Sequence, residues 1–175
     1  MKITIKYGTV VICGPTSTGK TTLSKRILDE MPWQGCELIS HDEVLREVWR
    51  PNMPQPQIDM EFQTSCFDLL SSAMKRDAPI IYEGKYYEKE RLYAFLLLLS
   101  MMDPMRPICL IKMATGAKMQ RKFARQRSGP KPTAKDMHLQ NYLFRGVLDT
   151  HYSESPNIQE FVVKNPEKLE LVFSG

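Results

Sequence analysis

This sequence has no long hydrophobic run and no paired cysteine motif. Its longest largely apolar stretch, Ala94–Met102, falls well short of the roughly 20 residues that a membrane-spanning helix needs, so we expect no membrane partner. The four cysteines form no C-x-x-C pair, and Cys13 and Cys109 lie within apolar runs, which is typical of free thiols in a reducing compartment. The apolar stretch Val10–Cys13 is too short for a signal peptide. We therefore expect a cytoplasmic protein.

Acidic residues are missing from one long segment of the chain. Between Lys112 and Lys135 the sequence has eight basic residues and no Asp or Glu, although the net charge of the whole chain is only +4. Because these eight positive charges exceed the net charge, the rest of the chain is net negative. Such a local excess of positive charge predicts an anionic partner for this segment.

A glycine-rich turn follows the first apolar strand that the sequence predicts, Thr9–Cys13. The segment GPTSTGKTT fits the pattern G-x-x-x-x-G-K-[ST] and opens a predicted helix, Lys20–Glu30. Glycines allow backbone N–H groups to surround a phosphate, and the helix N-terminus adds positive potential. The sequence therefore predicts an ATP site in which Lys20 reaches the β- and γ-phosphates and is catalytic, and in which the Thr21 hydroxyl holds Mg²⁺. The residues expected to bind ATP here are Gly14, Thr16, Ser17, Thr18, Gly19, Lys20, Thr21 and Thr22.

Short apolar strands and periodic helices alternate along the chain. Further strands are predicted at Glu37–Ser40, Pro79–Tyr82, Ile108–Ile111 and Phe161–Val163. Helices are predicted at Glu43–Trp49, Ile58–Arg76, Glu88–Met102, Gly116–Arg125 and from Ala134, capped by Thr133, to about Leu148, with a proline-rich loop at 50–57. This alternation indicates a three-layer α/β fold of the P-loop kinase type, with a parallel sheet of four to five strands. We expect residues 1–175 to form a single domain.

Three motifs of other P-loop enzymes are absent from the sequence. A switch GTPase requires D-x-x-G and N-K-x-D, and neither string occurs. A motor ATPase carries an acidic pair at the end of a strand, whereas Tyr82-Glu83-Gly84 has a single acid. What remains is the plan of a small kinase: a phosphate-binding loop, an acid after the second strand (Asp42) and a basic lid over about 118–136.

Three segments carry a resemblance to a known family. VVICGPTSTGKTTLSKRI, ELISHDEVLREV and RKFARQRSGPKPTAKDM resemble the corresponding segments of the polynucleotide 5′-hydroxyl kinase family of P-loop phosphotransferases. The resemblance implies that Asp42 is the general base toward the acceptor hydroxyl. It also implies that Arg121 and Arg125, on a lid helix, clamp ATP phosphates. We extend this expectation to Arg127, and we expect Arg125 to be the catalytic arginine.

The acceptor side of the sequence departs from that family. The family has an arginine three residues after the aspartate, where this chain has Leu45, and the nearest arginine is Arg46. After the third strand the family reads D-x-T-N, whereas this chain reads Glu83-Gly84-Lys85, which is closer to zeta-toxin-like small-molecule kinases. The residues expected to bind the acceptor are Asp42, Arg46, Glu83, Lys85 and Tyr86.

Two of these residues have ordinary structural alternatives. Asp42 could cap the helix that follows it, because Asp is a favoured N-cap residue. Glu83 could orient Mg²⁺ through water, or it could satisfy nearby backbone groups. The exposed arginines of the lid could equally form a solvated helix face.

The function that the sequence favours is an ATP- and Mg²⁺-dependent kinase that phosphorylates a hydroxyl of a nucleic acid, a polynucleotide 5′-hydroxyl of DNA being the first choice. One alternative acceptor is a hydroxymethyl group on a modified DNA base. A second alternative is a small-molecule kinase of zeta-toxin-like type that acts on a nucleotide, a nucleotide-sugar or an antibiotic. A third is a nucleotide-gated binding module without transfer. The sequence leaves the oligomeric state open.

Overall fold

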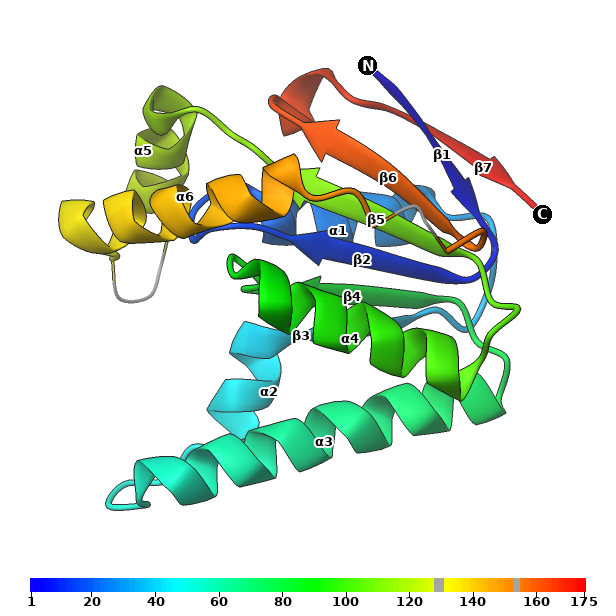
Figure 1. Cartoon of the computed structure of the whole chain (residues 1–175), viewed down its shortest axis with the longest axis horizontal. Helices are drawn as coiled ribbons and strands as arrows, with labels where there is room; N and C mark the ends of the chain where they lie inside the picture. Colours follow the sequence, from blue (N-terminus) through cyan, green and yellow to red (C-terminus); the bar gives the residue numbers. More distant parts are fainter. Residues whose placement is uncertain (128–130, 153–154) are drawn as a thin grey trace.

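Five parallel strands form the central sheet of the protein. The computed structural model describes residues 1–127, 131–152 and 155–175. The strands lie in the order β3-β4-β2-β5-β6, and every neighbouring pair is parallel. Their bounds are β2 Thr9–Cys13, β3 Glu37–Ser40, β4 Ile80–Gly84, β5 Ile108–Met113 and β6 Ile158–Val163. Because all five run the same way, their carboxyl ends meet at one edge, at the left of Figure 1.

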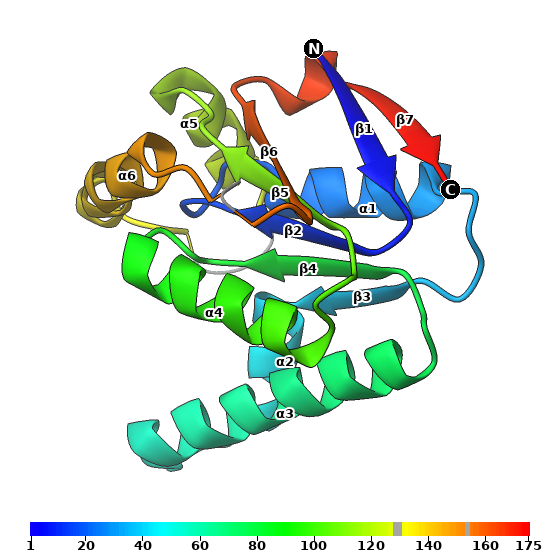
Figure 2. The ribbon, with the colours of Figure 1, turned by 45° about the vertical axis from the view of Figure 1, so that its right-hand side comes forward.

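Helices cover both faces of this sheet, which gives the three layers that the sequence predicted. The helices are α1 Lys20–Glu30, α2 His41–Val48, α3 Gln55–Lys75, α4 Lys89–Met102, α5 Ala117–Gln126 and α6 Ala134–Asp149. Helices α3, α4 and α6 lie on one face, while α1 lies on the other (Figures 1 and 2). Within the described residues, no helix combines the length and the apolar character that crossing a bilayer requires.

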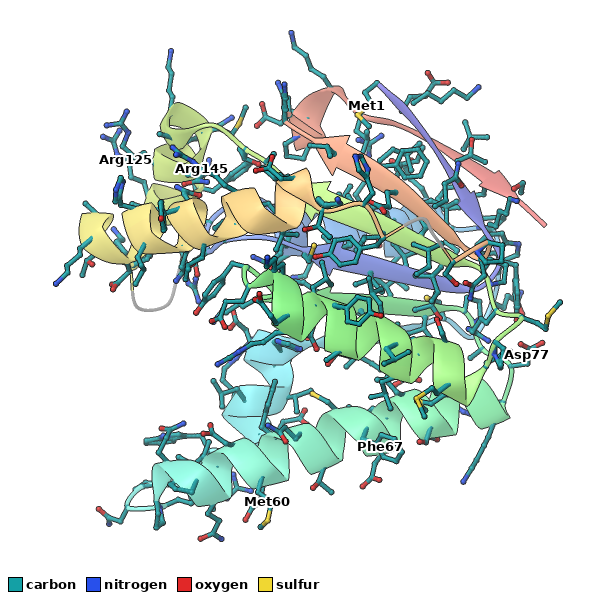
Figure 3. The ribbon with its side chains drawn as sticks, in the orientation of Figure 1. Met1, Met60, Phe67, Asp77, Arg125 and Arg145 are labelled. Atoms are coloured by element: carbon teal, nitrogen blue, oxygen red, sulfur yellow. The ribbon has the colours of Figure 1, made fainter. Side chains whose placement is uncertain are left out.

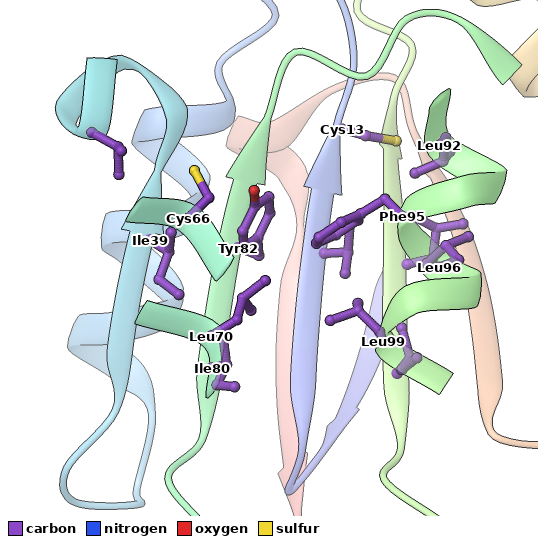
Figure 4. Close-up of a cluster of buried hydrophobic side chains, with 14 of the residues drawn as sticks. Cys13, Ile39, Cys66, Leu70, Ile80, Tyr82, Leu92, Phe95, Leu96 and Leu99 are labelled. Carbon is purple, nitrogen blue, oxygen red and sulfur yellow. The ribbon is translucent and has the colours of Figure 1, made fainter. Parts of the chain in front are cut away.

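The two faces of β2 explain how one short strand supports two hydrophobic cores. Side chains alternate along a strand, so Val11 and Cys13 pack toward α4 and α6, whereas Val10 and Ile12 pack toward α1. All four are at most 1% exposed. Figure 4 shows the first of these cores, where rings and aliphatic side chains from β4 and α4 interlock around Tyr82. A strand buried on both faces holds the turn that follows it in a fixed position.

A second, two-stranded parallel sheet covers part of the α1 face, and the sequence analysis did not predict it. It pairs β1, Lys2–Lys6, with β7, Glu170–Ser174, so that the first and last strands of the chain lie side by side (Figure 1). The alternation K-I-T-I-K buries Ile3 and Ile5 completely against the core beneath. The short helix η1, Pro166–Lys168, connects β6 to β7.

Local boundaries differ from the sequence prediction by two or three residues at several places, among them the starts of α2, α3 and β6. The predicted loop 50–57 ends early because α3 begins at Gln55, and a proline in the first turn of a helix lacks only an N–H that would have no helical partner. Helix α2 begins at His41 and its N-cap is Ser40, so the alternative that Asp42 is the cap is wrong. Thr133 does cap α6, in a reciprocal capping box with Asp136.

A buried ion pair fastens α6 to the sheet. Lys112 on β5 is 1% exposed, and its Nζ lies 2.7 Å from a carboxylate oxygen of Glu160 on β6. The same ammonium donates to the carbonyl oxygens of Val147, at 3.2 Å, and Thr150, at 2.8 Å, at the end of α6. Every hydrogen of this ammonium therefore has an acceptor, which is the condition for burying a charge without a large penalty.

We expect Lys112→Met to lower the free energy of unfolding by about 3–5 kcal/mol, because the Glu160 carboxylate would stay buried without its cation. The double variant Lys112→Met/Glu160→Gln should lose less, since it leaves no unpaired charge. Urea unfolding measures both. The exposed pair Lys122–Glu167 provides the control, and Lys122→Met should cost under about 1 kcal/mol. A Lys112→Met variant as stable as the control would contradict this role for the pair.

Candidate active site

The predicted phosphate-binding loop lies at the carboxyl end of β2. The side chain of Lys20 folds back over this loop, where its ammonium donates to the carbonyl oxygens of Gly14 and Pro15 at 2.9 and 2.7 Å. Burial lowers the pKa of Lys20 to about 8, and the nearby Glu83 carboxylate opposes that shift. Ser17 adopts a left-handed conformation, and its buried hydroxyl has no hydrogen-bond partner among the described residues. A loop with a buried cation and an unpaired hydroxyl suits a phosphate group.

Gly19 permits the turn from this loop into α1. Its φ of 89° lies in the left-handed region that side chains disfavour. A Cβ at this position would also lie 3.0 Å from the ring of Phe123 on α5 and 3.2 Å from Pro166 of η1. Glycine is therefore required here both by backbone conformation and by the close approach of two other elements.

The residues beside Thr21 fit a magnesium ion that is bound mainly through phosphate and water. The Thr21 hydroxyl donates to one carboxylate oxygen of Glu83 at 2.7 Å, and the Ser24 hydroxyl donates to the other at 3.1 Å. The described residues contain no cluster of three or more His, Cys, Asp or Glu side chains that could hold a metal. Mg²⁺ usually keeps several waters and takes few protein ligands in phosphate sites, so one hydroxyl and one nearby carboxylate are compatible with it.

A cavity of about 870 Å³ extends from the phosphate-binding loop to the ends of β3 and β4. It brings together the predicted ATP-binding residues Thr16, Ser17, Gly19, Lys20, Thr21 and Thr22, together with Asp42, Arg46, Glu83, Lys85 and Arg127. Six further charged, polar or aromatic side chains line it that the sequence analysis did not select: Lys25, Ser40, His41, Glu43, Phe123 and Gln126. The predicted nucleotide side and the predicted acceptor side thus share one space.

Asp42 lies between two cations at this cavity. Lys85 Nζ is 2.5 Å from one of its carboxylate oxygens, and Arg127 Nη2 is 3.3 Å from the other. Partial burial raises the pKa of Asp42, but the hydrogen bond and charge of Lys85, together with Arg127 and Lys20, outweigh burial and hold the pKa below its ordinary value. The carboxylate is therefore ionised at neutral pH. The Arg46 side chain also contacts Asp42, because its Nε donates to the backbone carbonyl oxygen of Asp42 at 3.0 Å.

His41 connects the end of β3 to the end of β4. The Lys85 N–H donates to its Nδ1 at 3.4 Å, so the ring proton resides on Nε2 and points at the Tyr82 hydroxyl, 2.9 Å away. Burial, followed by the charges of Lys85 and Lys20, lowers the pKa of His41 to about 4. Gly84 makes this contact possible, because a Cβ there would lie 2.7 Å from the Tyr86 ring and 3.0 Å from His41. His41 thus contacts the backbone of Lys85, the residue whose ammonium reaches Asp42.

Tyr86, predicted to bind the acceptor, lies in the hydrophobic core beside the cavity. Its ring stacks on Phe95 at a centroid distance of 4.9 Å and meets His41 edge-on at 5.1 Å. Tyr86 is absent from the residues that line the cavity, whereas its neighbour Lys85 is among them. Tyr86 therefore packs against the side of His41 that faces the core, and it supports the wall of the cavity without lining it.

The lid arginines face different directions. Arg127 lines the cavity, whereas Arg121 and Arg125 are exposed and do not line it, and Figure 3 shows Arg125 on the outer side of α5. Helical spacing explains the difference, since Arg127 falls on the same side as Phe123 and the buried Gln120, about 100° or more from Arg121 and Arg125. The amphipathic phase of this helix is the signal that would have singled out Arg127. Residues 128–130 of the predicted lid lie outside the described residues.

The low pKa of His41 gives the stability of the protein a pH dependence. An unfolded histidine has a pKa of about 6.5, so between pH 6.5 and 4 the unfolded chain takes up a proton that folded His41 rejects. The contribution of His41 to the free energy of unfolding should therefore be fully present above pH 6.5. It should fall on acidification, by on the order of 2 kcal/mol at pH 5. Urea unfolding at pH 7 and pH 5 measures the loss. His41→Asn should flatten it, whereas His138→Asn, on the exposed side of α6, should not. An unchanged slope in His41→Asn would argue against the assignment.

Comparisons with known proteins bear on the family and on the fold of the chain. Residues 10–145 match the family described as AAA domain. No protein with a curated description matches the sequence. Three similar solved structures share only the fold, at 12–16% identity.

The first is a sugar kinase from Janibacter sp., with 16% identity, a TM-score of 0.59, and coverage of 92% of this chain and 88% of that one. The second is a gluconokinase from Sinorhizobium meliloti, with 12% identity, a TM-score of 0.53, and coverage of 91% and 85%. The third is Kti12 from Chaetomium thermophilum in complex with ADP-AlF3, with 14% identity, a TM-score of 0.52, and coverage of 89% and 88%. The matched family, the phosphate-binding loop and the parallel sheet together lead to one conclusion: this chain belongs to the AAA domain family of P-loop proteins and has the fold of its kinase-like structural neighbours.

Proposed function

We propose that this protein is an ATP- and Mg²⁺-dependent kinase that phosphorylates a hydroxyl group of a small molecule. One observation carries the proposal: an ionised carboxylate, Asp42, lines the same cavity as the phosphate-binding lysine, Lys20. Two cations flank that carboxylate. A binding module without transfer has no need of an ionised carboxylate opposite the phosphate-binding loop.

Five side chains that line the cavity have a role in the proposed transfer: Lys20, Thr21, Asp42, Glu83 and Arg127. Magnesium-bound ATP would supply the phosphoryl group, held by the loop, by Lys20 and by the Thr21 hydroxyl next to Glu83. Asp42 accepts the proton of the acceptor hydroxyl. The oxygen of that hydroxyl bonds to the γ-phosphorus, while the bond between this phosphorus and the bridging oxygen of ADP breaks. A carboxylate with a low pKa is sufficient because phosphoryl transfer through a loose transition state needs positioning more than strong basicity. Arg127 neutralises the charge on the transferring group.

The shape of the site favours a small acceptor over the polynucleotide that the sequence favoured. A cavity of about 870 Å³ falls within the range of small-molecule sites. The basic side chains of α5 that would follow a nucleic-acid backbone, Lys118, Arg121 and Arg125, are exposed outside it. Structural neighbours named as a sugar kinase and a gluconokinase add support for a hydroxylated small molecule.

The acceptor class can be found by supplying labelled ATP with separate sets of candidates. The sets are sugars and sugar acids, nucleosides and nucleotides, nucleotide-sugars, hydroxylated antibiotics, 5′-hydroxyl oligonucleotides and hydroxymethyl-base duplex DNA. We expect label on a small molecule, and Asp42→Asn should lower kcat by about 10²–10⁴-fold with ATP affinity nearly intact, because only the proton acceptor is lost. Asp68→Asn, on the exposed face of α3, is the control.

Three outcomes would contradict the proposal or the role of Asp42 in it. Label on oligonucleotides alone would restore the polynucleotide kinase hypothesis. Tight ATP binding with no labelled product in any set would favour a binding module. Transfer that is unchanged in Asp42→Asn would remove the general-base role whichever acceptor is found.

Arg127 and Arg125 provide a matched pair for the lid. Arg127→Gln should lower kcat by about a hundredfold or more, because it removes a cation beside the transferring phosphoryl group. Arg125→Gln should change kcat by about twofold or less, the effect of an exposed substitution away from the cavity. Steady-state kinetics with the acceptor from the screen measures both. The reverse ranking would return the catalytic role to Arg125, as the sequence analysis had it.

A further inference from the structure

A side chain of α6 holds the phosphate-binding loop from outside the cavity. The backbone N–H of Thr16, near the tip of the loop, donates to Oε1 of Gln140 at 2.8 Å. These two residues are 124 positions apart, so the bond exists only because the fold brings α6 against the end of β2. Thr16 is 7% exposed, and in a site with so little water a lost partner for a backbone N–H is costly.

A second chain of hydrogen bonds holds the other side of the same turn. The Thr18 carbonyl accepts from the Thr115 hydroxyl at 2.7 Å, and the Thr115 carbonyl accepts from the buried Gln120 amide at 2.9 Å. Gln120 and Asn141 then exchange two amide hydrogen bonds, each 2.9 Å long. Asn141 follows Gln140 directly, so two adjacent residues of α6 secure the loop at Thr16 and at Thr18.

Helix α6 is capped at its first turn and fastened to the sheet at its last turn, which makes it a firm support. Its first turn carries the capping box of Thr133 and Asp136. Its last carbonyls accept from Lys112, which is fixed by Glu160, and Phe144 is buried between. A helix held in this way transmits a fixed position to Gln140, because packed elements of a core resist gradual deformation.

We propose that Gln140 is a positioning residue, one that fixes the tip of the phosphate-binding loop in the shape that receives the nucleotide. Its carboxamide oxygen accepts the hydrogen bond of the Thr16 N–H. The N–H groups that begin α1 have no partner within the helix and are available to phosphate. The connection through Asn141 and Gln120 also joins the loop to α5, the helix that leads to Arg127. The positions of α5 and α6 are thereby linked to the shape of the loop. This inference rests on the proposed function only in assigning a nucleotide to the loop.

Gln140→Met and Gln140→Glu separate positioning from general stability. Methionine has a similar length but no strong acceptor, whereas glutamate keeps an oxygen for the Thr16 N–H. Leu139→Ala, at an exposed position next to it, is the control. Amide hydrogen exchange of the nucleotide-free protein, followed by NMR, gives the first readout. Exchange at Thr16 should be about tenfold faster in Gln140→Met, the effect of losing one such bond, and unchanged in Gln140→Glu and Leu139→Ala. Exchange at Leu110, in the centre of β5, should stay the same in all three.

Calorimetric binding of Mg²⁺-ATP gives the second readout. Gln140→Met should weaken binding by about two- to tenfold, the range for one lost hydrogen bond, while Leu139→Ala should not weaken it. Unchanged exchange at Thr16 in Gln140→Met, faster exchange at Leu110 by the same factor, or unchanged ATP binding would each overturn the proposal. None of these measurements uses an acceptor. A protein that behaves as expected here yet phosphorylates nothing would refute the proposed kinase function and leave the positioning role intact.

Discussion

The parallel pairing of β4 with both β2 and β3 is the constraint on which the candidate active site depends. Ile12 of β2 pairs with Glu83, and Ser40 of β3 pairs with the same residue from the other side. The end of β4 therefore lies between the phosphate-binding loop and the start of α2. Glu83 reaches Thr21 on one side, and Lys85 reaches Asp42 on the other. A shift of one residue in this pairing would turn Glu83 to the opposite face and separate both contacts.

Charge at the site is balanced by short-range contacts. Lys20 is bonded to loop carbonyls, Lys85 to Asp42, and Glu83 to two hydroxyl groups. The neutral form of His41 suits this arrangement because its Nδ1 accepts the N–H of Lys85, whereas a protonated ring would add a third positive charge beside Lys85 and Lys20. The site can thus hold several charged groups in a partly buried space. An anionic nucleotide complements the excess of cations that line it.

Two kinds of support hold the phosphate-binding loop in place. The buried faces of β2 fix where the loop begins, and α6 fixes its tip through Gln140. Helix α6 in turn depends on the ion pair between the buried Lys112 and Glu160, whose side chain is 11% exposed. The basic residues of the segment 112–135 thus lie in three different environments. Lys112 lies in the core, Arg127 lines the cavity, and Arg121 and Arg125 are exposed.

Several features could be predicted from the sequence because they depend on local patterns. Apolar runs and helical periodicity located five strands and six helices within a few residues, and the spacing of Gly14, Gly19 and Lys20 predicted a P-loop between β2 and α1, where the structure has the turn. The strand β1 could have been found from its strict alternation, but its partner β7 lies at the other end of the chain, and isolated alternation is a weak signal.

Only the tertiary structure decided which residues far apart in the chain come into contact. The sequence by itself determined the class of fold, the glycine-rich turn between β2 and α1 and the presence of an acid after the second predicted β-α turn, Asp42. It could not determine that Lys85 and Arg127 would flank Asp42, that Tyr86 would turn into the core, or that Gln140 would hold Thr16. The physical reason is that patterns of period two or 3.6 show which side of an element is buried, whereas the pairing order of strands and the packing of helices decide which buried sides meet.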